Sequence, residues 1–411
     1  MATPVSKTKT ISVYPKTMHP PKLLNLSNLD RQCPILMYLV FFYKPSPACM
    51  NLSVNSVFGS LKAGLEETLS VWYPAAGRLS LNNTNDGKLN LWCNNDGAIL
   101  VEAVTQVKIS ELGDLSQYNE FFENLVFRPV FNGTFSDMPL VVAQVTRFGC
   151  GGYSLGIGTS HSLFDGPATF NFLCAWASNA TMKGNSGLEQ HKPVHERGTL
   201  LIDQIYGADG KLGGCKLSEV GSSNQENFVL RTFHLSGAMI ESLKRKLFGE
   251  KRGSFSCSSF EVVAAHLWKA RTKALGLRKE RMVCLQFAVD TRNKMVPLLP
   301  KGFSGNAYVL ASVALTAGEL EEESHEALIE KIKEAKNSVT NEYVKAYIEA
   351  LEAPQGTLPP LKELTLVSDW TRMPFHKVDF LHGEAAYASP LLPPIPQVAY
   401  FMQNPTESRR H

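Results

Sequence analysis

The stretch GTSHSLFDGPA, residues 158–168, joins an alternating run of residues to a helical run. Upstream, residues 153–161 alternate Tyr, Leu, Ile, Thr and His with Ser and Gly, which predicts a strand with one face open to close packing. Downstream, Asp165 can cap a helix that has Pro167 in its first turn. The pattern therefore places His161 at a strand-to-helix corner, where chains commonly expose chemistry.

The histidine of this stretch has two interpretations when it is taken alone. Imidazole is the usual proton acceptor near neutral pH, yet a packed or surface histidine is the more common case. Two other kinds of site are poorly supported. Residues 152–156 spell G-x-S-x-G, but they run from a turn into a strand, whereas a nucleophile elbow runs from a strand into a helix. No H-E-x-x-H motif or second histidine cluster indicates a metal.

Length and composition narrow the classes of protein. A chain of 411 residues is longer than a single core usually supports, so two domains are expected. The net charge of +3 is compatible with an anionic small substrate and too small to indicate nucleic acid. Eight cysteines without a C-x-x-C pair indicate neither a zinc ribbon nor a redox pair. No signal peptide or membrane span is visible, so we expect a cytoplasmic monomer.

Elements on either side of the opening stretch complete a first half. Residues 36–43 form an apolar run that predicts a buried strand. Apolar residues at helical spacing predict a helix over 58–72, which Pro74 ends. Residues 89–93 and 98–104 flank the turn NNDG and predict a hairpin.

A polar segment rich in Gly, Ser and Lys separates this half from a second αβ pattern. We predict domains at 1–180 and 228–411, joined by a linker at 181–227. The second half should begin with a strand at 228–235 and a helix that Ser236 caps. Its other expected elements are a helix opened by a capping box at 258–261, a strand at 283–290 and one long helix at 324–351.

Several separated motifs carry a resemblance to a known family. Besides HSLFDG at 161–166, they are YPAAGR at 73–78, SSFEVVAAHLW at 258–268, VDTR at 289–292, GNA at 305–307, DWTR at 369–372 and DF at 379–380. In kind and order they resemble the motifs of the plant BAHD acyltransferases, which use acyl-CoA donors. The resemblance covers nearly the whole chain. It reverses the interpretation of His161, which matches the family's base.

The resemblance implies an α/β fold with two domains, similar to chloramphenicol acetyltransferase. Each domain has a mixed β-sheet with flanking helices, and an active-site channel runs between the domains. Acyl-CoA is the implied co-substrate, with no tightly bound cofactor and no metal. The implied acceptor is an alcohol or amine of a plant specialised metabolite, acylated without a covalent enzyme intermediate.

The family's residue roles carry over to matching positions. The resemblance makes His161 the general base and gives Asp165 a structural role, paired with Arg292 beside the motif residue Gly166. Asp379 is a motif-implied catalytic position for which a structural role is the stronger expectation. Ser258 matches a position near coenzyme A, with helix capping as an equally good explanation. Ser368 and Trp370 match positions near the acceptor.

The C-terminal part departs from the family pattern. The family's D-F-G-W-G reads Asp379-Phe-Leu-His-Gly383 here, with Glu384 where a basic residue is usual. Leucine cannot adopt all the backbone angles of glycine, so the loop should have a different shape. Family members also usually continue beyond residue 405 with another strand and a helix. These departures favour an alternative, a catalytically silent accessory protein that binds acyl-CoA or a protein partner.

Overall fold

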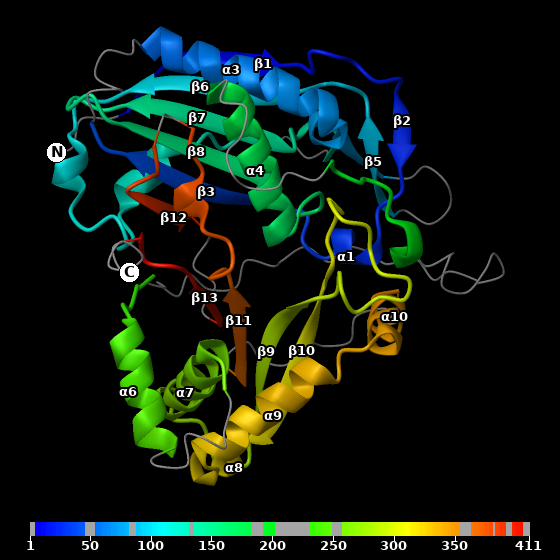
Figure 1. The fold of residues 1–411 in the computed structure, drawn as a ribbon, viewed down its shortest axis with the longest axis vertical. Coiled ribbons are helices and arrows are strands. Elements are labelled where there is room, and N and C mark those ends of the chain that lie inside the picture. The colour runs from blue at the N-terminus through cyan, green and yellow to red at the C-terminus, as the bar shows by residue number, and fades with distance from the viewer. Residues whose placement is uncertain are drawn as a thin grey trace.

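The structure is a computed structural model of the chain. It describes residues 5–45, 54–81, 88–130, 135–181, 192–201, 230–248, 257–352, 363–380, 383–391 and 397–405. Within these residues the strands form sheets of six, four and three strands. Figure 1 shows the six-stranded sheet in the upper half of the molecule and the four-stranded sheet in the lower half. The mixed α/β class predicted from the sequence is confirmed.

The six-stranded sheet contains the opening stretch. Its strand order is β1 (Ser6–Val13), β6 (Ala98–Val104), β7 (Val141–Arg147), β8 (Tyr153–Ser160), β3 (Leu36–Tyr43) and β12 (Tyr387–Leu391). Strands β6 and β7 are parallel and the other neighbours are antiparallel. The strands expected at 36–43 and 153–161 are present, and β8 is followed directly by His161.

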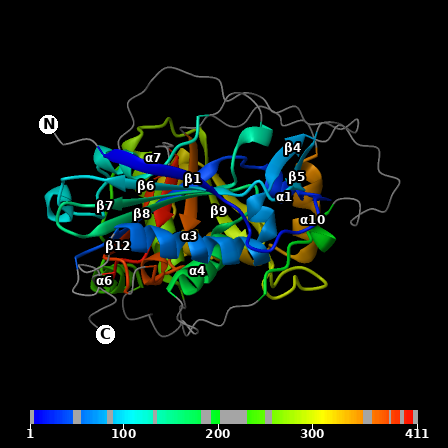
Figure 2. The same ribbon diagram turned by 90° about the horizontal axis from the view of Figure 1, so that it is seen from above.

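Two helices cover one face of this sheet. Helices α3 (Val54–Val71) and α4 (Gly166–Thr181) lie side by side on that face in Figure 2. Leu61, Leu65 and Leu69 recur at helical spacing on α3 and are fully buried in the same core as Phe172 and Trp176 of α4. Helix α3 begins before the predicted start at residue 58 and ends before a short 3₁₀ turn, η1 (Tyr73–Ala76).

The small residues of β8 face the other side of the sheet. A Cβ atom on Gly156 would lie 2.1 Å from the backbone oxygen of Leu125. Leu125 ends the 3₁₀ segment η3 (Glu120–Leu125). Leu125, Phe122 of the same segment and the following Val126 belong to one buried cluster. The close packing predicted for this face is therefore made by the chain itself.

The hairpin predicted around NNDG is wrong, although both of its strands exist. Strand β5 (Leu89–Cys93) pairs with β2 (Lys22–Leu24) and β4 (Arg78–Leu81) in the three-stranded sheet, whereas β6 joins the six-stranded sheet. The Arg78 guanidinium donates to the backbone oxygens of Asp96 at 3.1 Å and Gly97 at 2.8 Å. The turn is thus held by a side chain from YPAAGR, and the chain passes from one sheet to the other.

The four-stranded sheet forms the second core. Its order is β10 (Tyr308–Thr316), β9 (Met282–Asp290), β11 (Leu364–Asp369) and β13 (Val398–Phe401). Strand β11 is parallel to β9 and β13, and β10 is antiparallel to β9. The helices of this half are α6 (Gly237–Phe248), α7 (Ser259–Ala274), α8 (Ala317–Glu322), α9 (His325–Asn337) and α10 (Asn341–Ala350). Trp268, Phe287 and Ile332 bring α7, β9 and α9 into one buried cluster.

Two element predictions in this half are wrong. The helix expected over 324–351 is two helices, because Ser338 ends α9 and the Thr340 hydroxyl accepts from the Tyr343 amide at the start of α10. Residues 230–235 form no strand, and residues 228–229 lie outside the described residues. The backbone oxygen of Thr232 accepts instead from the Gln117 side chain at 3.1 Å.

A C-terminal segment returns to the first sheet. Strand β12 pairs with β3 so that Tyr387 lies opposite Phe42 and Leu391 lies opposite Tyr38. Just before it, Phe380 packs in the core under α3 and α4. The linker predicted at 181–227 lies outside the described residues apart from Thr181, which ends α4, and residues 192–201. The domain boundaries stay a prediction. Among the described helices, none has the length and hydropathy needed to cross a membrane.

Candidate active site

The backbone fixes His161 at the end of β8. Its amide donates to the Ile35 oxygen at 2.8 Å, just before β3, and the preceding Ser160 amide donates to the Leu140 oxygen. The imidazole is half-buried, and its centroid lies 5.8 Å from the Tyr308 ring. Burial raises the pKa of Tyr308 above its ordinary value, so this phenol stays protonated near neutral pH.

A neighbouring amide determines which ring nitrogen of His161 carries the proton. Nδ1 lies 3.1 Å from Asn306 Oδ1. Asn306 Nδ2 donates to the His161 backbone oxygen at 2.7 Å and to Asp30 Oδ1 at 2.9 Å. Because both of these partners only accept, the amide nitrogen must face them and its oxygen must face the ring. Nδ1 is therefore the donor, and Nε2 carries the lone pair.

The Asn306 amide is itself held by a buried ion pair. Asp30 lies on α1 (Asn28–Arg31), and its Oδ2 accepts from Arg197 Nε at 2.8 Å, with both side chains fully buried. Asp30 Oδ1 also accepts from the Asn306 backbone amide at 3.0 Å. Burial alone raises the pKa of Asp30, but Arg197 and the hydrogen bonds from Arg197 and Asn306 outweigh it and hold that pKa below its ordinary value. Asp30 is thus a carboxylate.

A second buried pair joins Asp165 to Arg292, the partner expected from the sequence. Two hydrogen bonds of 2.9 Å each connect the guanidinium with both carboxylate oxygens. Asp165 Oδ1 also accepts from the Ala168 amide in the first turn of α4, and Oδ2 accepts from the Ala307 amide. Both oxygens are engaged by these groups, and the ring nitrogen Nδ1 of His161 has Asn306 as its partner.

Gly166 lies where α4 meets the second half. A Cβ atom there would lie 2.8 Å from Cε and 2.9 Å from Sδ of Met373. Met373 follows β11, and its amide donates to the Trp370 oxygen at 3.0 Å. The absence of a side chain at 166 thus lets the thioether pack against the first turn of the helix.

The structure brings Ser368 and Trp370 together at the end of β11. Trp370 Nε1 donates to Ser368 Oγ at 2.8 Å. The indole lies 5.5 Å from the Tyr400 ring and 5.7 Å from the Phe375 ring, measured between centroids. Burial raises the pKa of Tyr400 to about 12, so this phenol is also neutral. The four side chains form a neutral, largely aromatic wall with two hydroxyls, those of Ser368 and Tyr400.

The remaining predicted site residues have contacts of a structural kind. The exposed Ser258 caps α7, where its Oγ accepts from the Glu261 amide at 3.3 Å. Asp379 accepts from the Gly383 amide, and the adjacent Phe380 ring packs 5.1 Å from Trp176 in the first core. Leu381 and His382 of the altered D-F-L-H-G lie outside the described residues. Ser154 of the G-x-S-x-G run is fully buried inside β8.

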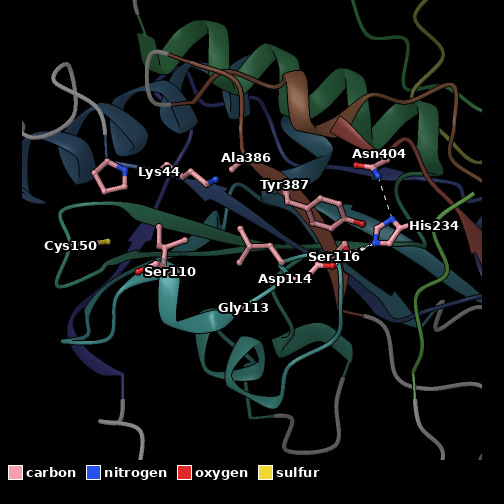
Figure 3. Close-up of a pocket in the computed structure, with 13 residues that line it drawn as sticks. Lys44, Ser110, Gly113, Asp114, Ser116, Cys150, His234, Ala386, Tyr387 and Asn404 are labelled. Carbon is pink, nitrogen blue, oxygen red and sulfur yellow. Dashed lines mark hydrogen bonds and ion pairs between the residues drawn. The ribbon is translucent and has the colours of Figure 1, made fainter. Parts of the chain in front are cut away.

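A cavity of about 680 Å³ lies at the other end of β8 (Figure 3). Cys150 on its wall precedes this strand of eight residues, whereas His161 follows it, so roughly 26 Å of strand separates them. In the cavity, His234 Nε2 lies 2.8 Å from Ser116 Oγ, and its Nδ1 lies 3.3 Å from Asn404 Nδ2. The lining residues are Lys44, Pro45, Ile109, Ser110, Gly113, Asp114, Leu115, Ser116, Cys150, His234, Ala386, Tyr387 and Asn404. This cavity is distinct from the His161 corner.

Sequence reasoning missed the groups that hold the His161 ring. Asn306 lay within the GNA motif but received no role, and Asp30 and Arg197 received none. A local signal exists for Asp30, because Ser27 and Asp30 form a capping box. That signal predicts a helix start and says nothing of Arg197 or Asn306, which lie 167 and 276 residues further along the chain.

Comparisons with known proteins agree with this architecture. A family model described as Transferase family matches residues 3–409. "Brassinosteroid-related acyltransferase 1" of Arabidopsis thaliana is 54% identical, over 100% of this chain and 94% of that protein. The crystal structure of vinorine synthase is similar with a TM-score of 0.77 at 21% identity, covering 98% of this chain and 92% of that chain. That of F. sporotrichioides TRI101 complexed with coenzyme A and T-2 has a TM-score of 0.66 at 14% identity, covering 94% and 92%.

The two structural matches show a shared fold, and the family model together with the 54% identical relative shows the family. The expected fold and enzyme class are thereby confirmed. The chain belongs to the Transferase family and is a member of the plant BAHD acyltransferases, enzymes that transfer acyl groups from coenzyme A thioesters.

Proposed function

We propose that His161 is the general base that activates the acceptor of this acyl transfer. The observation that carries the proposal is the amide of Asn306, which leaves the lone pair of the imidazole on Nε2. A base must accept a proton at the atom that faces its substrate. Because Nδ1 is already engaged as a donor, Nε2 is the atom that does this.

The reaction then proceeds in two steps with balanced protons. Nε2 takes the proton of the acceptor hydroxyl or amine while the acceptor's oxygen or nitrogen attacks the thioester carbonyl carbon. The tetrahedral oxyanion collapses, the C–S bond breaks, and the imidazolium returns the proton to the thiol of coenzyme A. No acyl-enzyme forms. General-base help contributes about 10²–10⁴-fold, and orientation of two substrates in one channel between the sheets contributes more.

The other site residues take supporting roles in this proposal. Ser368 and Trp370 lie on the acceptor side, where the aromatic wall suits an apolar acceptor. Ser368 accepts from the indole, so its own O–H can donate to the oxyanion, which needs such a donor. Asp165 with Arg292, and Asp379 with its loop, hold the frame. Ser258 lies on the coenzyme A side.

The acceptor is a plant specialised metabolite with an acylatable hydroxyl, and a brassinosteroid is the first compound to test. The support is the name of the relative that is 54% identical over the whole chain. In this proposal the enzyme acts as a monomer in the cytoplasm. Its two domains, 1–180 and 228–411, are joined by the linker at 181–227. Light scattering of the purified chain tests the monomer, and microscopy of the tagged chain tests the compartment.

Thiol release tests the proposed base directly. The assay pairs acetyl-, malonyl-, coumaroyl- and palmitoyl-CoA with a brassinosteroid, a long-chain alcohol, a phenol and an aliphatic amine. We expect acceptor-dependent thiol release, and a loss of about 10²–10⁴-fold in His161→Gln. His234→Gln, which removes a histidine at the remote cavity, is the matched control and keeps its rate. Full activity of His161→Gln would contradict the proposed base. Binding of acyl-CoA without turnover of any pair supports the accessory alternative.

A further inference from the structure

We propose that Asp30 is a positioning residue that sets the ring tautomer of His161 through Asn306. The inference rests on the proposed role of His161 as a base. It concerns a buried group that touches neither substrate nor the reacting atoms.

The amide of Asn306 has two orientations of nearly equal shape. Its NH₂ group and its oxygen occupy similar volumes, so packing does not distinguish them and hydrogen-bond partners do. Asp30 Oδ1 accepts at 3.0 Å from the backbone amide and at 2.9 Å from Nδ2 of Asn306. These two contacts to one oxygen fix both the place of the residue and the direction of its amide.

The negative charge of Asp30 favours one of the two orientations of the Asn306 amide. An ionised carboxylate has acceptors only, and the site is closed to water because the Asp30 side chain is fully buried. Its second oxygen is occupied by Arg197 Nε at 2.8 Å and by the Ser27 hydroxyl at 2.8 Å. Turning the Asn306 oxygen toward Asp30 would place two acceptors against each other, which is costly away from water.

The orientation of the amide then decides the tautomer. With the Asn306 oxygen facing the ring, Nδ1–H donates and Nε2 has the lone pair. Asparagine at position 30 keeps the shape of the side chain but can offer its own NH₂ to Asn306. Of the two acceptors that the structure gives Asn306 Nδ2, the neutral His161 backbone oxygen then remains, without the stronger pull of the carboxylate. We expect the Asn306 amide to turn and donate to Nδ1, which moves the ring proton to Nε2. A ring with Nε2–H has no lone pair for the acceptor, although its position is unchanged.

Asp165 is the matched control inside the same molecule. It is also buried, also pairs with an arginine, and also accepts from a backbone amide of the 305–307 segment, that of Ala307. Its contacts do not include the Asn306 side chain among those the structure gives it. Asp165→Asn thus repeats the loss of a buried charge without the change at the amide.

The test is the tautomer itself, read by NMR on the full chain with ¹⁵N-labelled histidine. Two-bond ¹H–¹⁵N correlations at a pH where the ring is neutral distinguish Nδ1–H from Nε2–H, and His161→Gln identifies the signal. We expect Nδ1–H in the wild type and in Asp165→Asn, and Nε2–H in Asp30→Asn. In the thiol-release assay, kcat of Asp30→Asn should fall by about 10²-fold or more, with KM for acyl-CoA within about threefold.

Folded Asp30→Asn that keeps Nδ1–H, or that keeps the wild-type kcat, overturns the proposal. If Asp30→Asn does not fold, Asn306→Ala gives the answer, because it leaves the Asp30–Arg197 pair in place and removes the amide. We expect Asn306→Ala to show a mixture of the two His161 tautomers and a loss of kcat similar to that expected for Asp30→Asn. If Asn306→Ala keeps the wild-type tautomer, the proposal is overturned as well. Full activity of His161→Gln would instead refute the proposed base and leave the tautomer result standing.

Discussion

Two buried carboxylates lie close to the same histidine in this molecule, and each is bound by an arginine. Asp30 and Arg197 are completely enclosed, whereas Arg292 beside Asp165 keeps 19% of its side chain exposed. Both carboxylates also accept a backbone amide from adjacent residues, Asn306 and Ala307. Chemically the pairs are nearly equivalent, and only one belongs to the recognised motif.

The difference lies in the third group that each carboxylate holds. Asp165 caps the first turn of α4 at Ala168 and so fixes the backbone on both sides of the interface. Asp30 instead holds the Asn306 side chain, which contacts the ring of His161. The motif aspartate is therefore a structural candidate, and a carboxylate 131 residues before the histidine in sequence is the candidate for positioning. The charge pair alone does not reveal which task it serves.

Removal of the enclosed arginine should have the largest effect on stability. Arg197→Met leaves the Asp30 carboxylate buried and unpaired, which costs about 3–5 kcal/mol of the free energy of unfolding. Arg292→Met should cost less, because water can reach part of that site. Urea unfolding of the two variants measures both values. Lys16→Met, in the exposed pair with Glu67, is the control and should change little. Equal losses in the two arginine variants would remove the distinction between the pairs.

Acid should lower the free energy of unfolding through His195, which contacts Arg197 of the enclosed pair. The backbone oxygen of His195 accepts from Arg197 at 2.6 Å, and burial lowers the pKa of its ring to about 4. The neutral ring is the folded form. As the pH falls below about 6.5, the unfolded chain gains a proton that the folded chain takes up only near pH 4. This difference costs about 3 kcal/mol of the free energy of unfolding by pH 4.

His195→Gln isolates that contribution, because every other titrating group is the same in both chains. Urea unfolding at pH 7, 5.5 and 4 should show a gap between variant and wild type that narrows or reverses as the pH falls. A gap that is constant over this range means that the buried ring does not destabilise the folded state in acid.

A methyl group at Gly305 should disturb the enclosed pair by crowding. A Cβ atom there would lie 2.7 Å from Cζ of Arg197, whose guanidinium is held by Asp30 and cannot withdraw freely. We expect Gly305→Ala to cost about 1–3 kcal/mol in thermal or urea unfolding and to lower kcat. Gly237→Ala, where nothing lies within 4 Å of the added atom, is the control and should be neutral or slightly stabilising. Wild-type stability of Gly305→Ala would show that the guanidinium can move.

The smallest effect is expected at the exposed contact in the remote cavity. His234 and Asp114 are 44% and 60% exposed, and their closest atoms are 3.6 Å apart. Exposed pairs contribute up to about 1 kcal/mol, so His234→Gln should lower stability by less than that and leave kcat unchanged. A loss of turnover in this variant would connect the cavity of Figure 3 with the His161 corner.

Local patterns predicted the part of this molecule that depends on neighbours in sequence. The alternation at 153–161, the cap at Asp165 and the capping box at 258–261 all have the structure that their spacing implies. Patterns failed where a distant group intervenes. The NNDG turn resembles a hairpin turn, but Arg78 holds it open between two sheets. The long helical pattern at 324–351 hides a break that Thr340 caps.

The site shows the same limit. The motif of the opening stretch makes His161 the candidate base, and the family match supplies the class of reaction. The partners of the ring are set by contacts across 145 to 276 residues, between Asn306, His161 and Asp30. A single sequence contains no local sign of such contacts, because each residue has an ordinary role in its own neighbourhood.

The most direct test of this comparison is the kcat of Asp30→Asn against that of Asp165→Asn, measured at one temperature where circular dichroism shows both chains folded. Both variants should melt at a lower temperature than the wild type, because each loses a buried ion pair. We predict that Asp30→Asn loses about 10²-fold or more of kcat and that Asp165→Asn stays within about tenfold of the wild type. Equal losses in the two folded variants, or the reverse order, would contradict the account.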